Sequence, residues 1–124
     1  MAKVLIFAPG DDEGEAERKL KAEGCEVLVG KAGWMTPQGD NESEMMALAS
    51  GCDALAGTSI RSTPITADIM RSSNRLRIVA KYTIGVDDVD VEAATDMGIL
   101  VTHGPTESNW GGVAEGTITA MLTM

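Results

Sequence analysis

The sequence is poor in the side chains that hold metal ions. Its 124 residues include two cysteines, Cys25 and Cys52, which lack CxxC spacing, and a single histidine, His103. A structural zinc site takes four cysteine or histidine ligands, so the chain lacks a set for one. We therefore expect no metal site and interpret both cysteines as reduced, partly buried thiols.

Basic residues and long apolar runs are also scarce. Ten lysines and arginines stand against nineteen aspartates and glutamates, which gives a formal charge of -9. Such a chain repels nucleic acid backbones and anionic membrane surfaces, so neither is expected as a partner. No apolar run approaches the roughly 20 residues that cross a bilayer, and the N-terminus is unlike a signal peptide. We therefore expect a soluble, cytoplasmic protein.

A dinucleotide-binding turn is missing as well. No two of the fourteen glycines have GxG spacing, the pattern that lets a phosphate reach the N-H groups of a helix N-terminus. The first apolar run is instead followed by Pro9, Gly10, Asp11, Asp12 and Glu13. Three carboxylates there would repel a pyrophosphate. We therefore expect neither a nicotinamide nor a flavin cofactor to bind this chain alone.

What the chain does contain is an alternation of short apolar runs and helical segments. We expect strands at residues 3–8, 25–29, 53–58, 76–81 and 99–102, with helices at about 11–22, 42–50, 66–73, 91–97 and 110–124. Asn41 and Glu44 have the spacing of a capping box. Strand-helix alternation predicts parallel strands with helices on both faces. The expected fold is α/β and flavodoxin-like, a doubly wound five-stranded parallel sheet of order 2-1-3-4-5.

An acidic pair after the first strand is also typical of phosphorylation receiver domains. A receiver needs an acceptor aspartate after the third strand and a lysine after the fifth. This chain has Thr58 at the first position and His103 at the second. We keep a degenerate receiver-like regulatory domain as an alternative only, and interpret Asp11 and Asp12 as helix caps.

Two side chains near strand ends could carry chemistry. His103 is the only imidazole and thus the only general base of that type, but no acidic residue lies within two positions of it. We interpret it as a strand-end residue that hydrogen-bonds locally. Tyr82 follows the fourth strand, at the edge where open α/β sheets bind ligands, so we expect it to line the crevice.

A long motif covers residues 76–102, which read LRIVAKYTIGVDDVDVEAATDMGILVT. This stretch resembles the pattern LKVIxRxGVGVDNVDVEAAxxxGIxV of the D-isomer-specific 2-hydroxyacid dehydrogenases, the superfamily of phosphoglycerate and formate dehydrogenases. Residues 109–117, NWGGVAEGT, are similar to a second block of the family, NxxSVAExT. Two ordered blocks at the family's spacing argue against coincidence.

The resemblance implies a substrate-binding loop after the fourth strand, formed by Tyr82, Thr83, Ile84 and Gly85. A tight turn there leaves N-H groups unpaired at the carboxyl edge of the sheet, where a substrate carboxylate can accept them. In the family the amides matching Ile84 and Gly85 hold the 2-keto or 2-hydroxy acid. Thr83 departs from the glycine that is usual at its position.

Further roles come from the resemblance alone. Asn109 matches an asparagine that hydrogen-bonds substrate, and Arg61 is the nearest candidate for the substrate-side arginine that many members carry. Val113, Glu115 and Thr117 match a helix that faces the nicotinamide side of the cleft.

Three nearby aspartates, Asp87, Asp88 and Asp90, are compatible with a metal site. In the family they match a structural turn and a helix cap. We favour the turn and cap over the metal site.

The resemblance divides the chain into a flavodoxin-like substrate-binding domain, residues 1–108, and a hinge helix, residues 109–124, leading into an NAD-binding domain that the chain lacks. The family's catalytic arginine, glutamate and histidine lie in that missing part. We therefore expect no catalytic residue in this chain, which is predicted to be inactive alone, and NAD or NADP only in a full-length parent.

The predicted function is the substrate-binding part of an NAD(P)-dependent oxidoreductase that acts on the CH-OH group of a D-2-hydroxy acid or the matching 2-keto acid. The alternative is a stand-alone flavodoxin-like module that binds a small carboxylic acid. We expect a truncated piece, because the chain ends inside an apolar helical segment. That segment carries Val113, Ile118, Met121 and Leu122, a stripe that predicts a homodimer.

Overall fold

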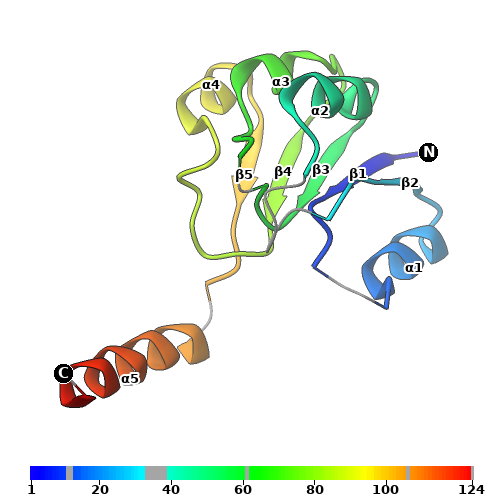
Figure 1. Cartoon of the computed structure of the whole chain (residues 1–124). Helices are drawn as coiled ribbons and strands as arrows, with labels where there is room; N and C mark the ends of the chain where they lie inside the picture. The colour runs from blue at the N-terminus through cyan, green and yellow to red at the C-terminus, as the bar shows by residue number, and fades with distance from the viewer. Residues whose placement is uncertain (11–12, 33–38, 61, 106, 124) are drawn as a thin grey trace.

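Five parallel strands and five helices form the described part of the chain (Figure 1). The computed structural model describes residues 1–10, 13–32, 39–60, 62–105 and 107–123, with side chains of the last range described from residue 111 onward. The strands are β1 (Lys3–Phe7), β2 (Glu26–Val29), β3 (Ala54–Gly57), β4 (Ile78–Lys81) and β5 (Leu100–Thr102). The helices are α1 (Glu15–Ala22), α2 (Glu42–Ala49), α3 (Ala67–Arg71), α4 (Val91–Asp96) and α5 (Glu107–Thr123).

The strand order is β2-β1-β3-β4-β5, and every neighbouring pair is parallel. This confirms the predicted order. Parallel neighbours need a crossover connection, and the helices between the strands supply it. The carboxyl ends of the strands, and the loops that follow them, therefore meet at one edge of the sheet.

Local signals account for most helix boundaries. The capping box before α2 is confirmed, because the Asn41 side chain accepts from the N-H of Glu44 and the Glu44 carboxylate accepts from the N-H of Asn41. Helix α1 begins at Glu15 with Gly14 as its N-cap, later than expected. Asp11 and Asp12 lie outside the described residues. Helix α5 begins at Glu107, earlier than predicted.

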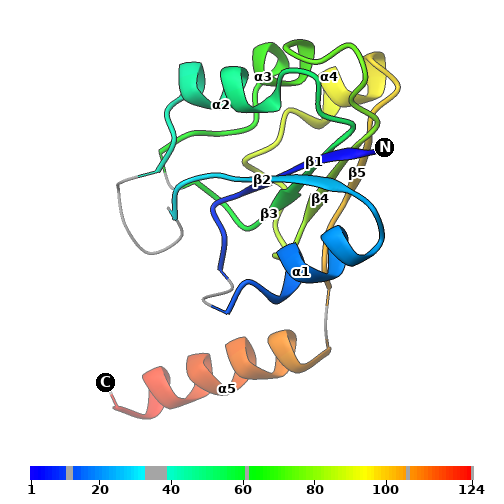
Figure 2. The same cartoon turned by 90° about the vertical axis from the view of Figure 1, so that its right-hand side faces the viewer.

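The core lies between the sheet and one helical layer. Helices α2, α3 and α4 cover one face, whereas α1 lies on the opposite face beside β2 (Figure 2). Leu5, Phe7, Leu55 and Val79 from the strands are buried against Met45 and Ile69 from the helices.

The α1 side of the sheet is less covered toward β5. Ala54, Ala56, Ile78 and Ala80 point to this side and are only partly buried, and Leu100 is 60% exposed. Within the described residues, the apolar side chains of β3, β4 and β5 on this side thus have little helical cover.

Helix α5 extends away from the sheet (Figure 1). Residues 111–123 are all exposed, including Val113, Ile118, Met121 and Leu122. Among the described residues, none of the helices has the length and apolar character that crossing a bilayer requires.

Candidate functional site

The loop after β4 lies at the carboxyl edge of the sheet and is held there on both sides. The N-H of Tyr82 donates to the carbonyl of Gly57 at the end of β3, at 2.8 Å. The carbonyl of Thr83 accepts from the N-H of Gly104, which follows β5, at 3.0 Å. Open α/β sheets bind ligands at this edge, so the loop occupies the expected place for a site.

Consecutive backbone amides of this loop point to anion binding. Among the described residues, no acceptor takes a hydrogen bond from the N-H groups of Thr83, Ile84 or Gly85. A Cβ added at Gly85 would meet nothing within 4 Å, and the φ angle of Gly85 is not positive. Glycine is therefore not required there by backbone strain, and the space beside it is open. Free N-H groups in a turn form a concave site for a carboxylate.

The far end of the loop is anchored to the segment after β3. The carbonyl of Asp88 accepts from the N-H of Ile65 at 2.6 Å, and the N-H of Asp90 donates to the carbonyl of Ile65 at 3.0 Å. These two bonds form an isolated parallel bridge between Ile65 and Val89. The loop is thus fixed at both ends while its central amides stay open.

Lys81 is a residue of this site that the sequence did not single out. Its side chain is completely buried, and its Nζ donates to Asp88 Oδ2 at 2.5 Å and to Ser59 Oγ at 2.7 Å. The ammonium also lies 5.8 Å from the ring centroid of Phe7. The one signal in the sequence was its position two residues after Val79, because alternate residues of a strand lie on the same face and Val79 is buried.

The neighbouring aspartates have separate structural roles. Asp90 caps α4, since its Oδ1 accepts from the N-H of Ala93 at 3.0 Å, as the cap interpretation predicts. Asp88 forms the ion pair with Lys81, and Asp87 is exposed. Within the described residues, no cluster of three metal-binding side chains occurs.

Tyr82 lies beside a small hollow. It is 43% exposed and lines a cavity of about 290 Å³ together with Ile6, Pro9, Gly10 and Val29, at the ends of β1 and β2. The wall also includes Glu13 and Glu17, near the start of α1. The hollow therefore combines apolar side chains with a negative rim.

The other expected site residues are less informative. His103 is exposed and makes no hydrogen bond with another described residue, so the expected local bond is not found among them. Arg61 and the side chain of Asn109 lie outside the described residues. Val113, Glu115 and Thr117 are exposed on α5, where the Thr117 hydroxyl donates to the carbonyl of Val113.

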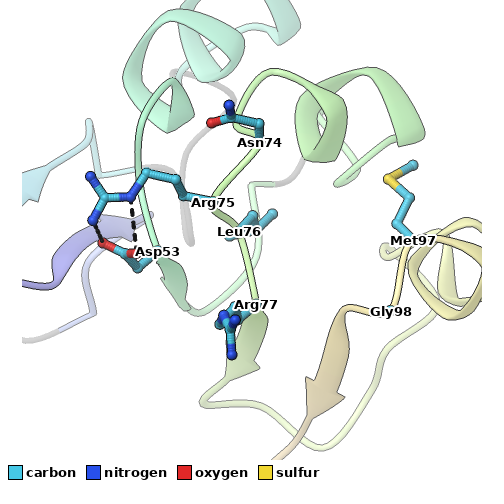
Figure 3. A pocket seen from close by; sticks show the side chains of 7 residues that line it. All are labelled: Asp53, Asn74, Arg75, Leu76, Arg77, Met97 and Gly98. Atoms are coloured by element: carbon cyan, nitrogen blue, oxygen red, sulfur yellow. Dashed lines mark hydrogen bonds and ion pairs between the residues drawn. The ribbon is translucent and has the colours of Figure 1, made fainter.

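A larger hollow of about 700 Å³ lies at the amino ends of the strands, at the edge of the sheet opposite the loop after β4 (Figure 3). Its lining includes Asp53, Asn74, Arg75 and Arg77. Arg75 donates to Asp53 through Nε at 3.3 Å and Nη2 at 3.1 Å. The N-H of Lys3 and the Arg75 guanidinium together lower the pKa of Asp53. Because one arginine is already neutralised and ligands of doubly wound sheets bind at the carboxyl edge, we do not assign the site here.

Comparison with known families places the chain clearly. Residues 4–117 match the model of the D-isomer specific 2-hydroxyacid dehydrogenase catalytic domain. This match covers both sequence blocks and all of the sheet except Lys3, the first residue of β1. It leaves no support for the receiver alternative.

Individual relatives agree with that match. The chain is 36% identical to a D-3-phosphoglycerate dehydrogenase of Mycobacterium leprae, over 68% of this chain and 15% of that protein. It is 31% identical to the D-3-phosphoglycerate dehydrogenase of Synechocystis, over 100% of this chain and 20% of that one. The chain thus spans a fifth or less of these curated relatives.

A solved structure shows the same fold. The NAD+-bound 3-phosphoglycerate dehydrogenase of Entamoeba histolytica superposes with a TM-score of 0.73 at 21% identity. The superposition covers 97% of this chain and 38% of that one.

Proposed function

The chain belongs to the D-isomer specific 2-hydroxyacid dehydrogenase family, and we propose that it forms the substrate-binding part of an NAD(P)-dependent oxidoreductase. The reaction would interconvert the CH-OH group of a D-2-hydroxy acid and the matching 2-keto acid. The observation that carries this proposal is the row of open amides at Thr83, Ile84 and Gly85, which lies in the stretch that matches the family.

These amides are suited to bind the carboxylate of the substrate, which does not take part in the reaction. The N-H groups of Ile84 and Gly85 would donate to the carboxylate, and charge-assisted hydrogen bonds of this kind are stronger than neutral ones. Fixing the carboxylate would orient the adjacent C2 atom for chemistry supplied from outside the described residues. Tyr82 would border the bound acid, and Asn109 and Arg61 would add side-chain donors.

The described residues do not fit a dinucleotide. The first turn of α1 carries Glu15 and Glu17. Their negative charge would repel a pyrophosphate at the N-terminus of this helix. The methyl of Thr58 lies only 3.2 Å from the position of a Cβ at Gly10, so the turn after β1 is closely packed. NAD or NADP would therefore bind another part of the enzyme, with Val113, Glu115 and Thr117 of α5 toward the nicotinamide.

A homodimer and a cytoplasmic location belong to this proposal. The apolar side chains of α5 are exposed, and a 17-residue helix that contains Gly111, Gly112 and Gly116 is marginal in water without packing. A second copy related by a twofold axis would supply that packing.

Titration of the chain with glyoxylate, followed by amide nuclear magnetic resonance, tests the proposal. We expect saturable shifts at Thr83, Ile84 and Gly85. The Gly85→Val variant should fold, because the space beside Gly85 is open, but should bind at least about tenfold more weakly. Gly111→Val places the same side chain at another open glycine and should bind as the unaltered chain does. Binding by Gly85→Val at full strength would contradict the assignment.

A further inference from the structure

Lys81 is the last residue of β4, next to the loop with the open amides, yet its ammonium is closed off from solvent. Its side chain is 0% exposed. Its Nζ donates to Asp88 Oδ2 at 2.5 Å and to Ser59 Oγ at 2.7 Å, and it lies 5.8 Å from the ring centroid of Phe7. A buried ammonium needs such close partners to offset its lost hydration. The charge of Lys81 is therefore used inside the fold and is not presented to a substrate carboxylate.

The partners of Lys81 lie on separate segments of the chain. Ser59 follows β3 and is 22 residues before Lys81, whereas Asp88 is seven residues after it, at the far end of the loop. One ammonium thus joins the end of β3 to both ends of the loop. Residues 82–87 lie between the two members of the ion pair, so the pair acts as a cross-link across the loop.

Both ends of this cross-link are also held by the backbone around them. At the near end, the N-H of Tyr82 donates to the carbonyl of Gly57 at 2.8 Å. At the far end, the carbonyl of Asp88 accepts from the N-H of Ile65 at 2.6 Å. The ion pair therefore fixes the separation between two ends that are each anchored to a different neighbour.

The open amides depend on these ends for their directions. Among the described residues, no acceptor takes a hydrogen bond from the N-H groups of Thr83, Ile84 or Gly85. A loop that holds its binding conformation for only a fraction of the time binds its ligand more weakly by that fraction. A loop that is already held in place avoids the cost of ordering on binding. A cross-link between the loop ends thus bears directly on affinity.

We propose that Lys81 is a positioning residue of the substrate site. Through Asp88 and Ser59 it holds the amides of Ile84 and Gly85 in the directions that one carboxylate needs, and it does not contact the substrate itself. This inference rests on the proposed function, because it concerns the same loop and the same ligand.

The Asp88→Asn variant separates positioning from direct attraction, because the two roles predict changes of opposite sign. The variant leaves the ammonium of Lys81 without its carboxylate. If Lys81 attracted the substrate by its charge, the unpaired charge would tighten the binding of glyoxylate. Positioning predicts the reverse. We expect glyoxylate, titrated into the full chain and followed by amide nuclear magnetic resonance, to bind at least about tenfold more weakly.

The order of the loop provides a second readout that needs no ligand. Backbone relaxation of the unaltered chain should give order parameters of about 0.85 for the N-H groups of Thr83, Ile84 and Gly85, the value of rigid backbone. In Asp88→Asn these values should fall toward about 0.6, while those of the strands stay unchanged. A merely structural role, in which the whole fold is weakened, would not single out these three amides.

Three further variants complete the set. Ser59→Ala keeps the ion pair but removes the second tether, and should weaken glyoxylate binding about threefold. Asp68→Asn makes the same chemical change in the exposed pair with Arg71 and should bind as the unaltered chain does. Ala49→Gly, at the buried end of α2, should lower stability by itself and leave the affinity unchanged.

The remaining outcomes decide against the proposal. Binding by Asp88→Asn that is as tight as in the unaltered chain, or tighter, overturns it. Weaker binding with unchanged order parameters also overturns it, as does an equal loss of affinity in Ala49→Gly. If Asp88→Asn does not fold, Ser59→Ala decides, and unchanged affinity or unchanged loop order in that variant overturns the positioning role.

Failure of the proposed function is distinguishable from failure of this inference. If glyoxylate shifts no loop amide even in the unaltered chain, the proposed function fails and the positioning role fails with it. If glyoxylate binds at the loop but the order parameters and the affinity do not respond to Asp88→Asn, the positioning role alone is overturned.

Discussion

Lys81 and Asp88 form an ion pair across the two ends of the loop whose amides are open, with Nζ 2.5 Å from Oδ2 and the lysine side chain fully buried. The pair closes the loop on itself. The open amides of Thr83, Ile84 and Gly85, which lie between the two residues, are therefore held in place without using their own donors.

The first prediction concerns the stability that depends on this pair. Asp88→Ala leaves a buried ammonium with only the Ser59 hydroxyl, so the free energy of unfolding should fall by about 3 kcal/mol. Asp68→Ala breaks an exposed pair with Arg71 and should cost less than about 1 kcal/mol. Urea unfolding of both variants measures the two values. A similar small loss in both would show that the buried pair is not a structural anchor.

A second prediction follows from the lowered pKa of Asp53. A carboxylate whose pKa is lower in the folded chain stabilises the fold above its unfolded pKa of about 3.9, and this contribution is lost as the pH falls through the folded pKa. The melting temperature of Asp53→Asn should therefore lie below that of the unaltered chain at pH 7. The two should converge below pH 4. A gap that does not narrow as the pH falls below the unfolded pKa would contradict the charge contribution.

Association through α5 gives a third prediction. Met121 and Leu122 are 69% and 81% exposed, so changing both to aspartate removes apolar surface without disturbing the core. We expect a dimer in light scattering that weakens in this double variant. Thr119→Asp places a charge on the same helix outside the apolar set and serves as the control. A chain that is monomeric at high concentration would rule out this dimer.

The fourth prediction is that the chain alone does not bind NADH. Among the described residues, the acidic first turn of α1 and the close packing of Thr58 against Gly10 disfavour a pyrophosphate at the turn after β1. Calorimetry should give a dissociation constant weaker than about 1 mM. Micromolar binding, or turnover of any 2-hydroxy acid by the purified chain, would refute the division of roles between this chain and a cofactor domain.

Sequence patterns predicted the sheet because its order depends on local periodicity and on short right-handed crossovers. The capping box at Asn41 and Glu44 was predictable for the same reason, since all its atoms lie within one turn. The start of α1 at Glu15 was not, because the left-handed Gly14 takes the N-cap position without a side-chain bond.

The site was predictable only in part. The motif at residues 76–102 indicated the loop. Substrate binding by the open amides of this loop stays a prediction. The role of Lys81 could not be read from the sequence, because a lysine at a strand end is ordinarily solvated. Its burial depends on Ser59, which is 22 residues away in the chain, and on Phe7 from β1.

The most direct test of the whole account is the location of glyoxylate on the chain. Amide shifts mapped across the described residues should concentrate at Thr83, Ile84 and Gly85 and should saturate. They should leave the hollow at Arg75 and Arg77 unaffected. Saturable shifts at that amino-edge hollow with none at the loop would contradict the assignment of the carboxyl edge as the substrate site.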